Sequence, residues 1–302
     1  MCIETQYCQM RLIKELVLKI AIHQMCSGVN VADNADAMAK SIRSAAEQGA
    51  GMYFAPEMSG LIDRDRTRAK AAIGIESASL ALSAAQSACK EARIWAHLGS
   101  LPIKNDENDT LTRNRTFVID DSGVIRARYD KIHLFDVDLL NGESWRESNA
   151  YASGDSVVIV DTPRGAMGLS ICYDLRFPKL YNILRDSGAT VFAVPAAFTV
   201  PTGEAHWHVL LRARAIENAS FVVAAAQSGQ HEDGRQTYGH SVVIDPWGKV
   251  LLDMGRETGL ALVELDLSEI DAARAQIPVH LNQRPIPDPT RIYDEEHVRA
   301  MQ

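Results

Sequence analysis

The sequence predicts an α/β protein built on a mixed sheet that is covered by helices. Short apolar runs typical of buried strands alternate with longer segments whose apolar residues recur at helical spacing. Two β-hairpins are expected where turn residues separate apolar runs, at Asp121-Ser122-Gly123 and at Asp245-Pro246-Trp247-Gly248. No linker-like or low-complexity segment divides the 302 residues, so the alternation predicts one continuous unit.

The first half of the chain opens with an apolar run and a helical pattern that stops at Gly49. Next comes an apolar run that ends at Glu57. It is followed by an alanine-rich helix, a further apolar run and the first hairpin. The predicted strands cover 16–22, 52–56, 95–101, 116–120 and 124–125, and the predicted helices cover 32–48 and 77–92.

The second half repeats this alternation and adds the second hairpin before a last strand. The predicted strands cover 157–160, 166–171, 190–195, 221–226, 241–244, 249–252 and 259–266, and the predicted helices cover 178–186 and 206–218.

We expect a single domain over residues 16–285, preceded by an extension over 1–15 and followed by a tail over 286–302. Residues 1–15 carry no clear pattern and are expected to be loosely ordered. The chain after Pro278 contains Pro285, Pro287 and Pro289, so it is expected to lack regular structure. Tails of this kind often pack against a partner subunit.

Composition narrows the range of partners. The net charge of −8, from 39 acidic and 31 basic residues, is mildly acidic and dispersed, which argues against nucleic acid or an anionic membrane surface as the main partner. The five cysteines, at positions 2, 8, 26, 89 and 172, contain no C-x-x-C pair and suit reduced thiols. No apolar stretch approaches the roughly 20 residues of a membrane span. A cytoplasmic protein is therefore expected.

Three chemically suggestive residues follow three separate predicted strands. Glu57 follows 52–56, Lys131 follows 125–130, and Cys172 closes the run 167–171. In an open α/β sheet, strand ends project side chains into the crevice where ligands bind. Each residue alone has an ordinary structural explanation, as a buried thiol, a salt-bridged carboxylate or a surface lysine. Together, they are the parts of a cysteine hydrolase that does not use histidine.

The segments around these residues resemble the three signature blocks of the nitrilase superfamily of carbon–nitrogen hydrolases. The blocks are Tyr-Phe-Ala-Pro-Glu at 53–57, Tyr-Asp-Lys-Ile-His-Leu-Phe-Asp at 129–136, and Gly-Leu-Ser-Ile-Cys-Tyr-Asp-Leu-Arg-Phe-Pro at 168–178. They occur in order within a similarity that spans roughly residues 17 to 285, and Ala55 is one small departure. The resemblance implies a four-layer α-β-β-α sandwich and a homodimer or larger even homo-oligomer.

The same resemblance implies roles for four residues. Cys172 is the nucleophile, Glu57 the general base and Lys131 the cation that faces the tetrahedral intermediate; Glu147 matches a second glutamate of the family site. These roles suit the chemistry, because a free thiol needs a nearby base at neutral pH and an oxyanion needs donors such as Lys131 and the backbone N–H of Tyr173. The thiol, the two carboxylates and the ammonium should titrate as a coupled cluster. No cofactor is expected.

Segments 195–218, 238–241 and 245–248 look like the amidase branch of the family that hydrolyses deaminated glutathione. That branch implies cleavage of an N-(4-oxoglutarate)-cysteinylglycine amide to 2-oxoglutarate and cysteinylglycine. Such a substrate is anionic, and Arg176 is expected to bind its 2-oxoacid carboxylate by a bidentate pair, unless Arg176 forms a structural salt bridge with Asp174 or another acid. The residues expected to line the pocket are Tyr173, Phe198, Thr199 and Trp207.

Other activities remain open at this point. The site could release ammonia from a 2-oxoacid ω-amide, or hydrolyse an N-carbamoyl compound. A non-catalytic binding scaffold is a further alternative, although a scaffold has no need of all four residues of the site. A thiol-redox sensor is another alternative, but no cysteine near 172 in sequence offers a resolving partner.

No metal site is expected from the histidines. His206 and His208 are two residues apart on a predicted helix, so they point to different faces. His133 and His240 are expected to be core residues or to support the site from behind. Arg212, Arg214 and Glu217 are expected to form a buried or interface ion-pair network.

Overall fold

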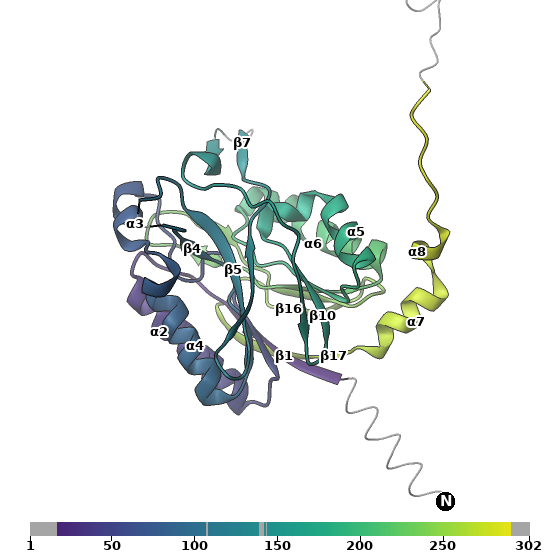
Figure 1. Ribbon diagram of the computed structural model, residues 1–302, viewed down its shortest axis with the longest axis horizontal. Helices are drawn as coiled ribbons and strands as arrows, with labels where there is room; N and C mark the ends of the chain where they lie inside the picture. The colour runs from purple at the N-terminus through teal and green to yellow at the C-terminus, as the bar shows by residue number, and fades with distance from the viewer. Residues whose placement is uncertain (1–16, 107, 139–141, 143, 291–302) are drawn as a thin grey trace, which may run out of the picture.

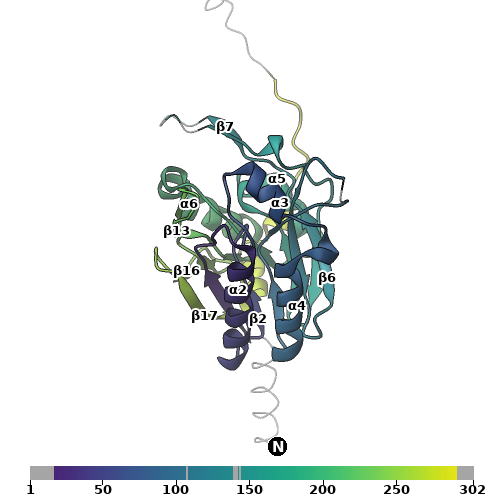
Figure 2. The ribbon, with the colours of Figure 1, turned by 90° about the vertical axis from the view of Figure 1, so that its left-hand side faces the viewer.

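The computed structural model describes residues 17–106, 108–138, 142 and 144–290, which form four layers (Figure 1). Helices α2 (Val31–Glu47) and α4 (Leu80–Ala92) cover a first sheet, and Figure 2 shows them side by side. A second sheet packs on the other face of the first and is covered by α5 (Pro178–Asp186) and α6 (Val200–Asn218). The α-β-β-α sandwich expected from the sequence is confirmed.

The first sheet has seven strands. Its strands β1 (Val17–Gln24), β2 (Met52–Phe54) and β3 (Trp95–His97) run parallel to one another. Antiparallel strands flank them: β17 (Gly259–Asp266) pairs with β1, and β5 (Arg113–Ile119) pairs with β3, β4 (Leu101–Ile103) and β6 (Ile125–Asp130). Because β5 is antiparallel to both β3 and β6, the carboxyl ends of β2 and β6 lie at the same edge of the sheet.

The second sheet has six strands, with a parallel centre and antiparallel margins. The parallel strands are β10 (Gly165–Leu169), β11 (Val191–Ala193) and β12 (Phe221–Ala224). The margins are β9 (Ile159–Thr162) beside β10, and the hairpin of β15 (Val242–Ile244) and β16 (Val250–Asp253) beside β12.

The first sheet is buried on both faces, which explains its continuous apolar runs. In β1, Ile20 and Ile22 face the core between the sheets, whereas Ala21 faces the helices, in the two-residue alternation of a strand. Side chains such as Ala35 and Ala85 give α2 and α4 a close approach to the sheet. The core between the sheets continues beneath α5 and α6 and joins both halves of the chain.

Several short elements were not predicted, because they bury too little to create an apolar pattern. Helix α3 (Arg66–Ala72) has no buried residue, and α7 (Ser268–Gln276) buries only Ile270 and Ala273. Other unpredicted elements include η1 (Glu76–Ala78), β7 (Asp136–Asp138), β8 (Ser144–Arg146), η2 (Glu147–Asn149), β13 (Ser228–Gln230) and β14 (Gln236–Tyr238).

The prediction that the chain after Pro278 is irregular is wrong for its first turn. Helix α8 (Val279–Asn282) follows Pro278 directly, where the missing backbone N–H removes no helical hydrogen bond. Residues 283–290 contain the later prolines and have no regular structure. The extension over 1–15 and the end of the tail, 291–302, lie outside the described residues. Among the described helices, none is long and apolar enough to cross a membrane.

Candidate active site

A cavity of about 460 Å³ opens where strand ends of the two sheets meet. Its lining includes all four residues predicted for the reactive site: Glu57, Lys131, Glu147 and Cys172. Glu57 lies in the turn after β2, Lys131 directly follows β6, and Cys172 follows β10 at the start of a helical turn, η3 (Cys172–Arg176). Glu147 begins η2 after the short strand β8. The topology therefore brings together residues up to 115 positions apart.

Lys131 is the centre of this group. Its Nζ donates to Glu57 Oε1 at 3.0 Å and to Glu147 Oε2 at 2.9 Å. The lysine side chain is only 2% exposed, so both contacts are shielded from water. Burial alone would lower the pKa of the Lys131 ammonium, but the Glu147 and Glu57 carboxylates raise that pKa well above its ordinary value. Lys131 is therefore a fixed cation at neutral pH.

Further donors hold the two carboxylates in place. The Asn114 amide of β5 donates to Glu57 Oε1 at 2.9 Å and to Glu147 Oε1 at 3.3 Å. The Ala197 backbone N–H donates to the other Glu57 oxygen at 2.9 Å, and the Phe135 N–H donates to Glu147 Oε2 at 2.7 Å. Each carboxylate is thus oriented by donors from separate segments of the chain.

Cys172 occupies a strained position in front of these groups. Its φ of 48° lies in the left-handed region, which is uncommon for a residue other than glycine. Its N–H donates to Pro195 O at 2.9 Å, which fastens the turn to the end of β11. Burial and the adjacent Glu57 carboxylate raise the pKa of the Cys172 thiol well above its ordinary value, and Lys131 opposes this only in part. The resting thiol therefore keeps its proton and faces a carboxylate that can accept it.

Asp174 fastens the Cys172 turn to the Lys131 loop. This fully buried carboxylate accepts the Ile171 N–H at 2.9 Å and the Tyr129 hydroxyl at 2.7 Å. It also contacts His133 through the backbone N–H at 3.0 Å and the ring Nδ1 at 2.6 Å. The alternative that Asp174 pairs with Arg176 is therefore wrong, because the Asp174 oxygens are already engaged, and His133 supports the site from behind as expected.

The expected network of Arg212, Arg214 and Glu217 is correct only in part. Arg214 is buried, contacts Glu217 at 3.0 Å and donates to Leu175 O at 2.8 Å, which holds the end of η3 against α6. Arg212 lies on another face of α6 and donates instead to Gly248 O at 2.9 Å.

The residues predicted to bind substrate lie around the same cavity. Arg176, Tyr173, Phe198 and Thr199 all line it. The Arg176 guanidinium lies over the Phe198 ring at 5.7 Å and contacts His206 Nδ1 at 3.2 Å. Trp207 was also expected in the lining, but it is 1% exposed and lies behind Phe198, with ring centroids 4.7 Å apart. Trp207 therefore supports the wall without reaching the cavity.

Asn114 is a site residue that the sequence did not predict. It lies in β5, whose start at Arg113 comes three residues before the predicted strand 116–120. No signature block contains Asn114. A buried asparagine within a strand is unusual, because asparagine is depleted in strands and its amide needs partners. That anomaly was the available signal.

Comparison with known proteins agrees with this geometry. The carbon-nitrogen hydrolase family model matches residues 19–275. The chain is 41% identical over 269 residues to the deaminated glutathione amidase of Dictyostelium discoideum, a match that covers 86% of this chain and 92% of the relative. The chain therefore belongs to the carbon–nitrogen hydrolase family.

Solved structures show the same fold. The Caenorhabditis elegans NitFhit protein superposes with a TM-score of 0.82 at 38% identity, over 89% of this chain and 65% of that chain. An amidase from Nesterenkonia sp. AN1 superposes with a TM-score of 0.72 at 25% identity, over 88% of this chain and 96% of that chain. That structure is of a glutamate-to-glutamine mutant and shows covalent addition of the acetamide moiety of fluoroacetamide at the active site cysteine.

Proposed function

We propose that this protein is an amidase that hydrolyses deaminated glutathione to 2-oxoglutarate and cysteinylglycine through a thioester on Cys172. The observation that carries the proposal is the hydrogen-bonded group of Glu57, Lys131 and Glu147 in front of Cys172, at one end of a cavity rich in cations. The similarity to amidases of that name supports the choice of substrate.

In the first half of the reaction, the Cys172 sulfur attacks the amide carbonyl carbon while its proton passes to Glu57. The carbonyl oxygen becomes an oxyanion, which Lys131 Nζ and the Tyr173 N–H at the start of η3 are suited to stabilise. Glu57 then gives the proton to the amide nitrogen, the C–N bond breaks and cysteinylglycine leaves. The 2-oxoglutaryl group remains on sulfur as a thioester.

In the second half, water attacks the thioester carbonyl. Glu57 takes a proton from this water, and the same oxyanion contacts stabilise the second tetrahedral intermediate. When the C–S bond breaks, the proton returns from Glu57 to sulfur and 2-oxoglutarate leaves. In both halves, Glu147 and Asn114 act as positioning residues, because they hold Lys131 and Glu57 and have no reacting atom of their own.

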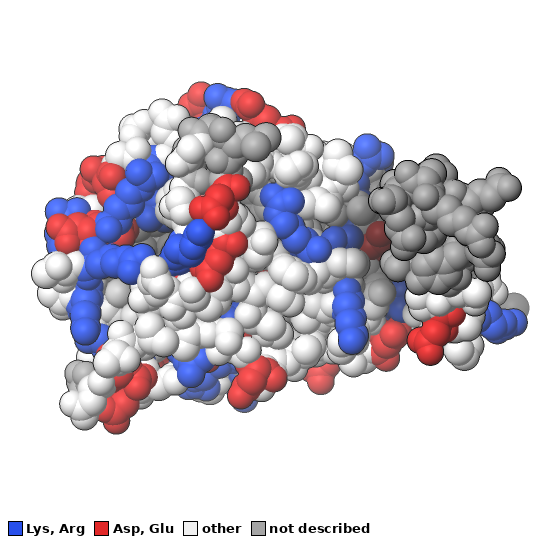
Figure 3. Space-filling model, turned by 90° about the horizontal axis from the view of Figure 1, so that it is seen from above, with Lys and Arg blue, Asp and Glu red and all other residues white. Residues whose placement is uncertain are grey.

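The charge of the cavity supports an anionic substrate. Its lining contains three carboxylates but eight cationic side chains, and Figure 3 shows Lys and Arg side chains gathered on this face of the molecule. Two of the arginines, Arg64 and Arg235, each lie 5.1 Å from the centre of the Trp145 ring. The eight cations are Arg64, Arg66, Lys70, Lys104, Lys131, Arg146, Arg176 and Arg235.

Deaminated glutathione carries a carboxylate at each end. One cation near Cys172 and a second group of cations farther along the cavity could therefore bind the two carboxylates of one substrate molecule. Arg176 contacts a histidine and an aromatic ring, and among the described residues no carboxylate forms an ion pair with it. It is therefore available for the 2-oxoacid carboxylate. Arg66 and Lys70 of α3, with Lys104, are suited to the carboxylate of the terminal glycine.

The assembly and compartment proposed from the sequence belong to the same hypothesis. We infer a homodimer or larger even oligomer of a single 16–285 domain, supported by exposed apolar side chains on α6 and α8, which include Val209 at 69% and Leu281 at 70% exposure. Sedimentation equilibrium measures this state. The described cysteines Cys26, Cys89 and Cys172 are free thiols, which suits a cytoplasmic enzyme with a reduced nucleophile.

A product panel tests the proposed reaction. Wild-type protein is incubated separately with deaminated glutathione, a 2-oxoacid ω-amide and an N-carbamoyl amino acid. Release of cysteinylglycine and 2-oxoglutarate at the highest kcat/KM supports the proposal. Preferred release of ammonia alone, or of ammonia with carbon dioxide, would reassign the enzyme to ω-amides or carbamoyl compounds. Binding without turnover of any of the three would favour a scaffold.

A further inference from the structure

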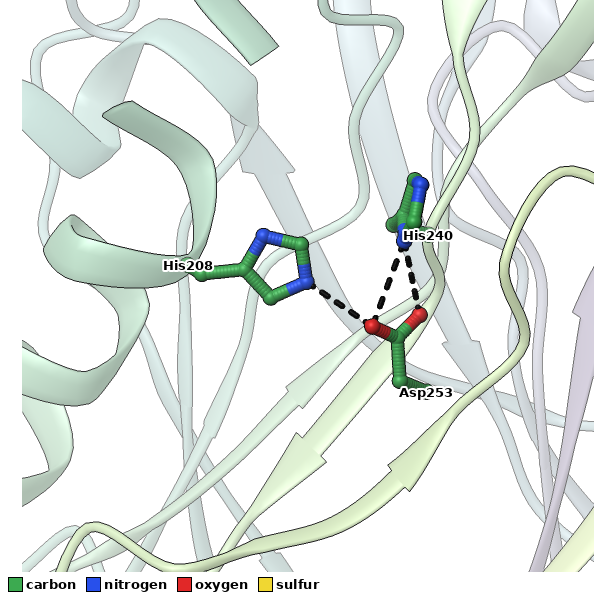
Figure 4. A group of neighbouring side chains, drawn as sticks. All are labelled: His208, His240 and Asp253. Carbon is green, nitrogen blue, oxygen red and sulfur yellow. Dashed lines mark hydrogen bonds and ion pairs between the residues drawn. The ribbon is translucent and has the colours of Figure 1, made fainter. Parts of the chain in front are cut away.

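Outside the cavity, three side chains from distant parts of the chain converge on one point of the surface (Figure 4). His208 lies on α6, His240 lies in the loop between β14 and β15, and Asp253 ends β16. His208 Nε2 is 2.9 Å from Asp253 Oδ2, and His240 Nδ1 is 2.9 Å from Asp253 Oδ1. None of the three lines the cavity around Cys172. His240, which was expected to lie in the core or to support the site from behind, does not line the cavity itself.

The backbone of His240 is held firmly by its surroundings. Its φ of 54° is left-handed, its N–H donates to Gly255 O, and its carbonyl accepts from the buried Trp207 Nε1 at 2.7 Å. The Tyr238 ring stacks on the imidazole with centroids 4.4 Å apart. The Gly255 N–H, 2.9 Å from Asp253 Oδ1, fixes the carboxylate. The three groups are thus preorganised from separate elements of the fold.

The spacing of the donor atoms suits a single metal ion. Nitrogen and oxygen ligands at about 2.0–2.1 Å from Zn²⁺ are separated from one another by roughly 3.0–3.4 Å. The two imidazole nitrogens lie 2.9 Å and 2.9–3.2 Å from the Asp253 oxygens, and all three ligand atoms lie within 4.8 Å of one another. Small rotations of the rings would open this group to an ion at its centre.

The chemistry of the donors selects the kind of metal. Two imidazoles and one carboxylate suit borderline ions such as Zn²⁺, Co²⁺, Ni²⁺ and Cu²⁺, whereas Mg²⁺ and Ca²⁺ prefer oxygen ligands throughout. The side chains are 22–34% exposed, which leaves room for water as a further ligand. Arg256, three residues after Asp253, is paired with Glu204 at 2.9 Å and not with Asp253, so it does not compete with an ion for that carboxylate.

We propose that His208, His240 and Asp253 form a site for a divalent transition metal such as Zn²⁺. The bound ion joins α6 to the β15–β16 hairpin. The spacing of His206 and His208 could not reveal this site, because its other two ligands follow 32 and 45 residues after His208. The alternative is a plain hydrogen-bonded group in which both imidazoles donate to one carboxylate. The two descriptions differ in measurable metal affinity.

Calorimetric titration with ZnCl₂ tests the proposal. We use untagged full-length protein carrying Cys172→Ala, so that the reactive thiol cannot bind the ion. One equivalent of Zn²⁺ should bind with a Kd of about 10 µM or tighter, and His208→Ala and Asp253→Asn should each weaken binding at least about 10-fold. His280→Ala, which removes a histidine on α8, is the matched control and should leave Kd unchanged.

Two results would overturn the proposal: binding no tighter than about 1 mM, or equal affinity in His208→Ala and its parent. Should a variant fail to fold, electron paramagnetic resonance of the parent protein loaded with one equivalent of Cu²⁺ gives an independent answer. Two coordinated imidazole nitrogens are expected. A spectrum without imidazole nitrogen, or with only one, would contradict the site.

Discussion

At the Cys172 end of the cavity, Lys131 lies 3.0 Å from Glu57 and 2.9 Å from Glu147, so its charge is matched within the protein. At the α3 end, Lys70 and Lys104 also line the cavity, but among the described residues no carboxylate forms an ion pair with either. Glu57 and Lys131 are buried and the Glu147 side chain is only 12% exposed, whereas Lys70 is exposed.

This contrast separates two tasks that one cavity must perform. Charges that are paired and shielded from water hold their geometry, which suits bond making and breaking. Cations near solvent that have no carboxylate partner can attract an anionic substrate, because the substrate does not have to displace a protein carboxylate. Substitutions at the Cys172 end should therefore change kcat, and substitutions at the α3 end should change KM.

The largest expected effect comes from Cys172→Ala. Without the sulfur, no thioester can form, so turnover of deaminated glutathione should fall below about 1% of wild type. The melting temperature should change little, because alanine fits a buried strand end. Cys26→Ser, which alters an exposed thiol outside the cavity, is the control and should retain activity. Activity above about 1% of wild type in folded Cys172→Ala would show that Cys172 is not the nucleophile.

Glu57→Gln should have the next largest effect. The amide keeps the size of the side chain but cannot accept the thiol proton, so kcat should fall by about 10²–10⁴-fold with a small change in KM. Steady-state kinetics measures both constants, with Glu91→Gln on α4 as a surface control. A rise in KM at unchanged kcat would mean that Glu57 only binds substrate.

Arg176→Lys tests the boundary between the two ends. Loss of a bidentate contact to the 2-oxoacid carboxylate should cost about 1.5–3 kcal/mol, which corresponds to a KM roughly 10- to 150-fold higher. The value of kcat should change little. Arg43→Lys on α2 provides the matched control. If KM is unchanged, the carboxylate binds elsewhere in the cavity.

Lys70→Ala should have a smaller effect of the same kind. Because this side chain is exposed, its interaction with a carboxylate should be worth only about 0.2–1 kcal/mol, or roughly a 1.5- to 5-fold rise in KM that shrinks in high salt. Lys40→Ala on α2 should leave KM unaltered at every salt concentration. An effect on kcat at either salt concentration would break the proposed division of the cavity.

The smallest expected change is in the pH profile. The pKa values of the Cys172 thiol and the Lys131 ammonium are both raised, so each group keeps its proton as the pH rises past the value at which an ordinary thiol ionises. Neither group should therefore reduce kcat between about pH 7 and 8.5. A loss of kcat centred near pH 8 and seen in every buffer tested would show that one of the two groups ionises there.

The contrast between the two ends also explains what could be predicted from the sequence. Glu57, Lys131 and Cys172 each follow a strand, and strand periodicity together with recognisable blocks locates them. Asn114 lies inside β5, and two partners of Asp174, Tyr129 in β6 and His133 just after it, lie 45 and 41 residues earlier, so no local pattern reveals these hydrogen bonds. Helix α3 escaped prediction because it has no buried face, although its cations line the cavity.

A rapid acid quench of the wild-type enzyme during turnover of deaminated glutathione, followed by peptide mass spectrometry, shows directly whether a thioester forms on Cys172. We expect one added 2-oxoglutaryl group on the peptide that contains Cys172, formed and lost at rates that match the release of cysteinylglycine and of 2-oxoglutarate. Full turnover with no adduct on Cys172 at any quench time, or an adduct derived from the cysteinylglycine half, would contradict the proposed mechanism.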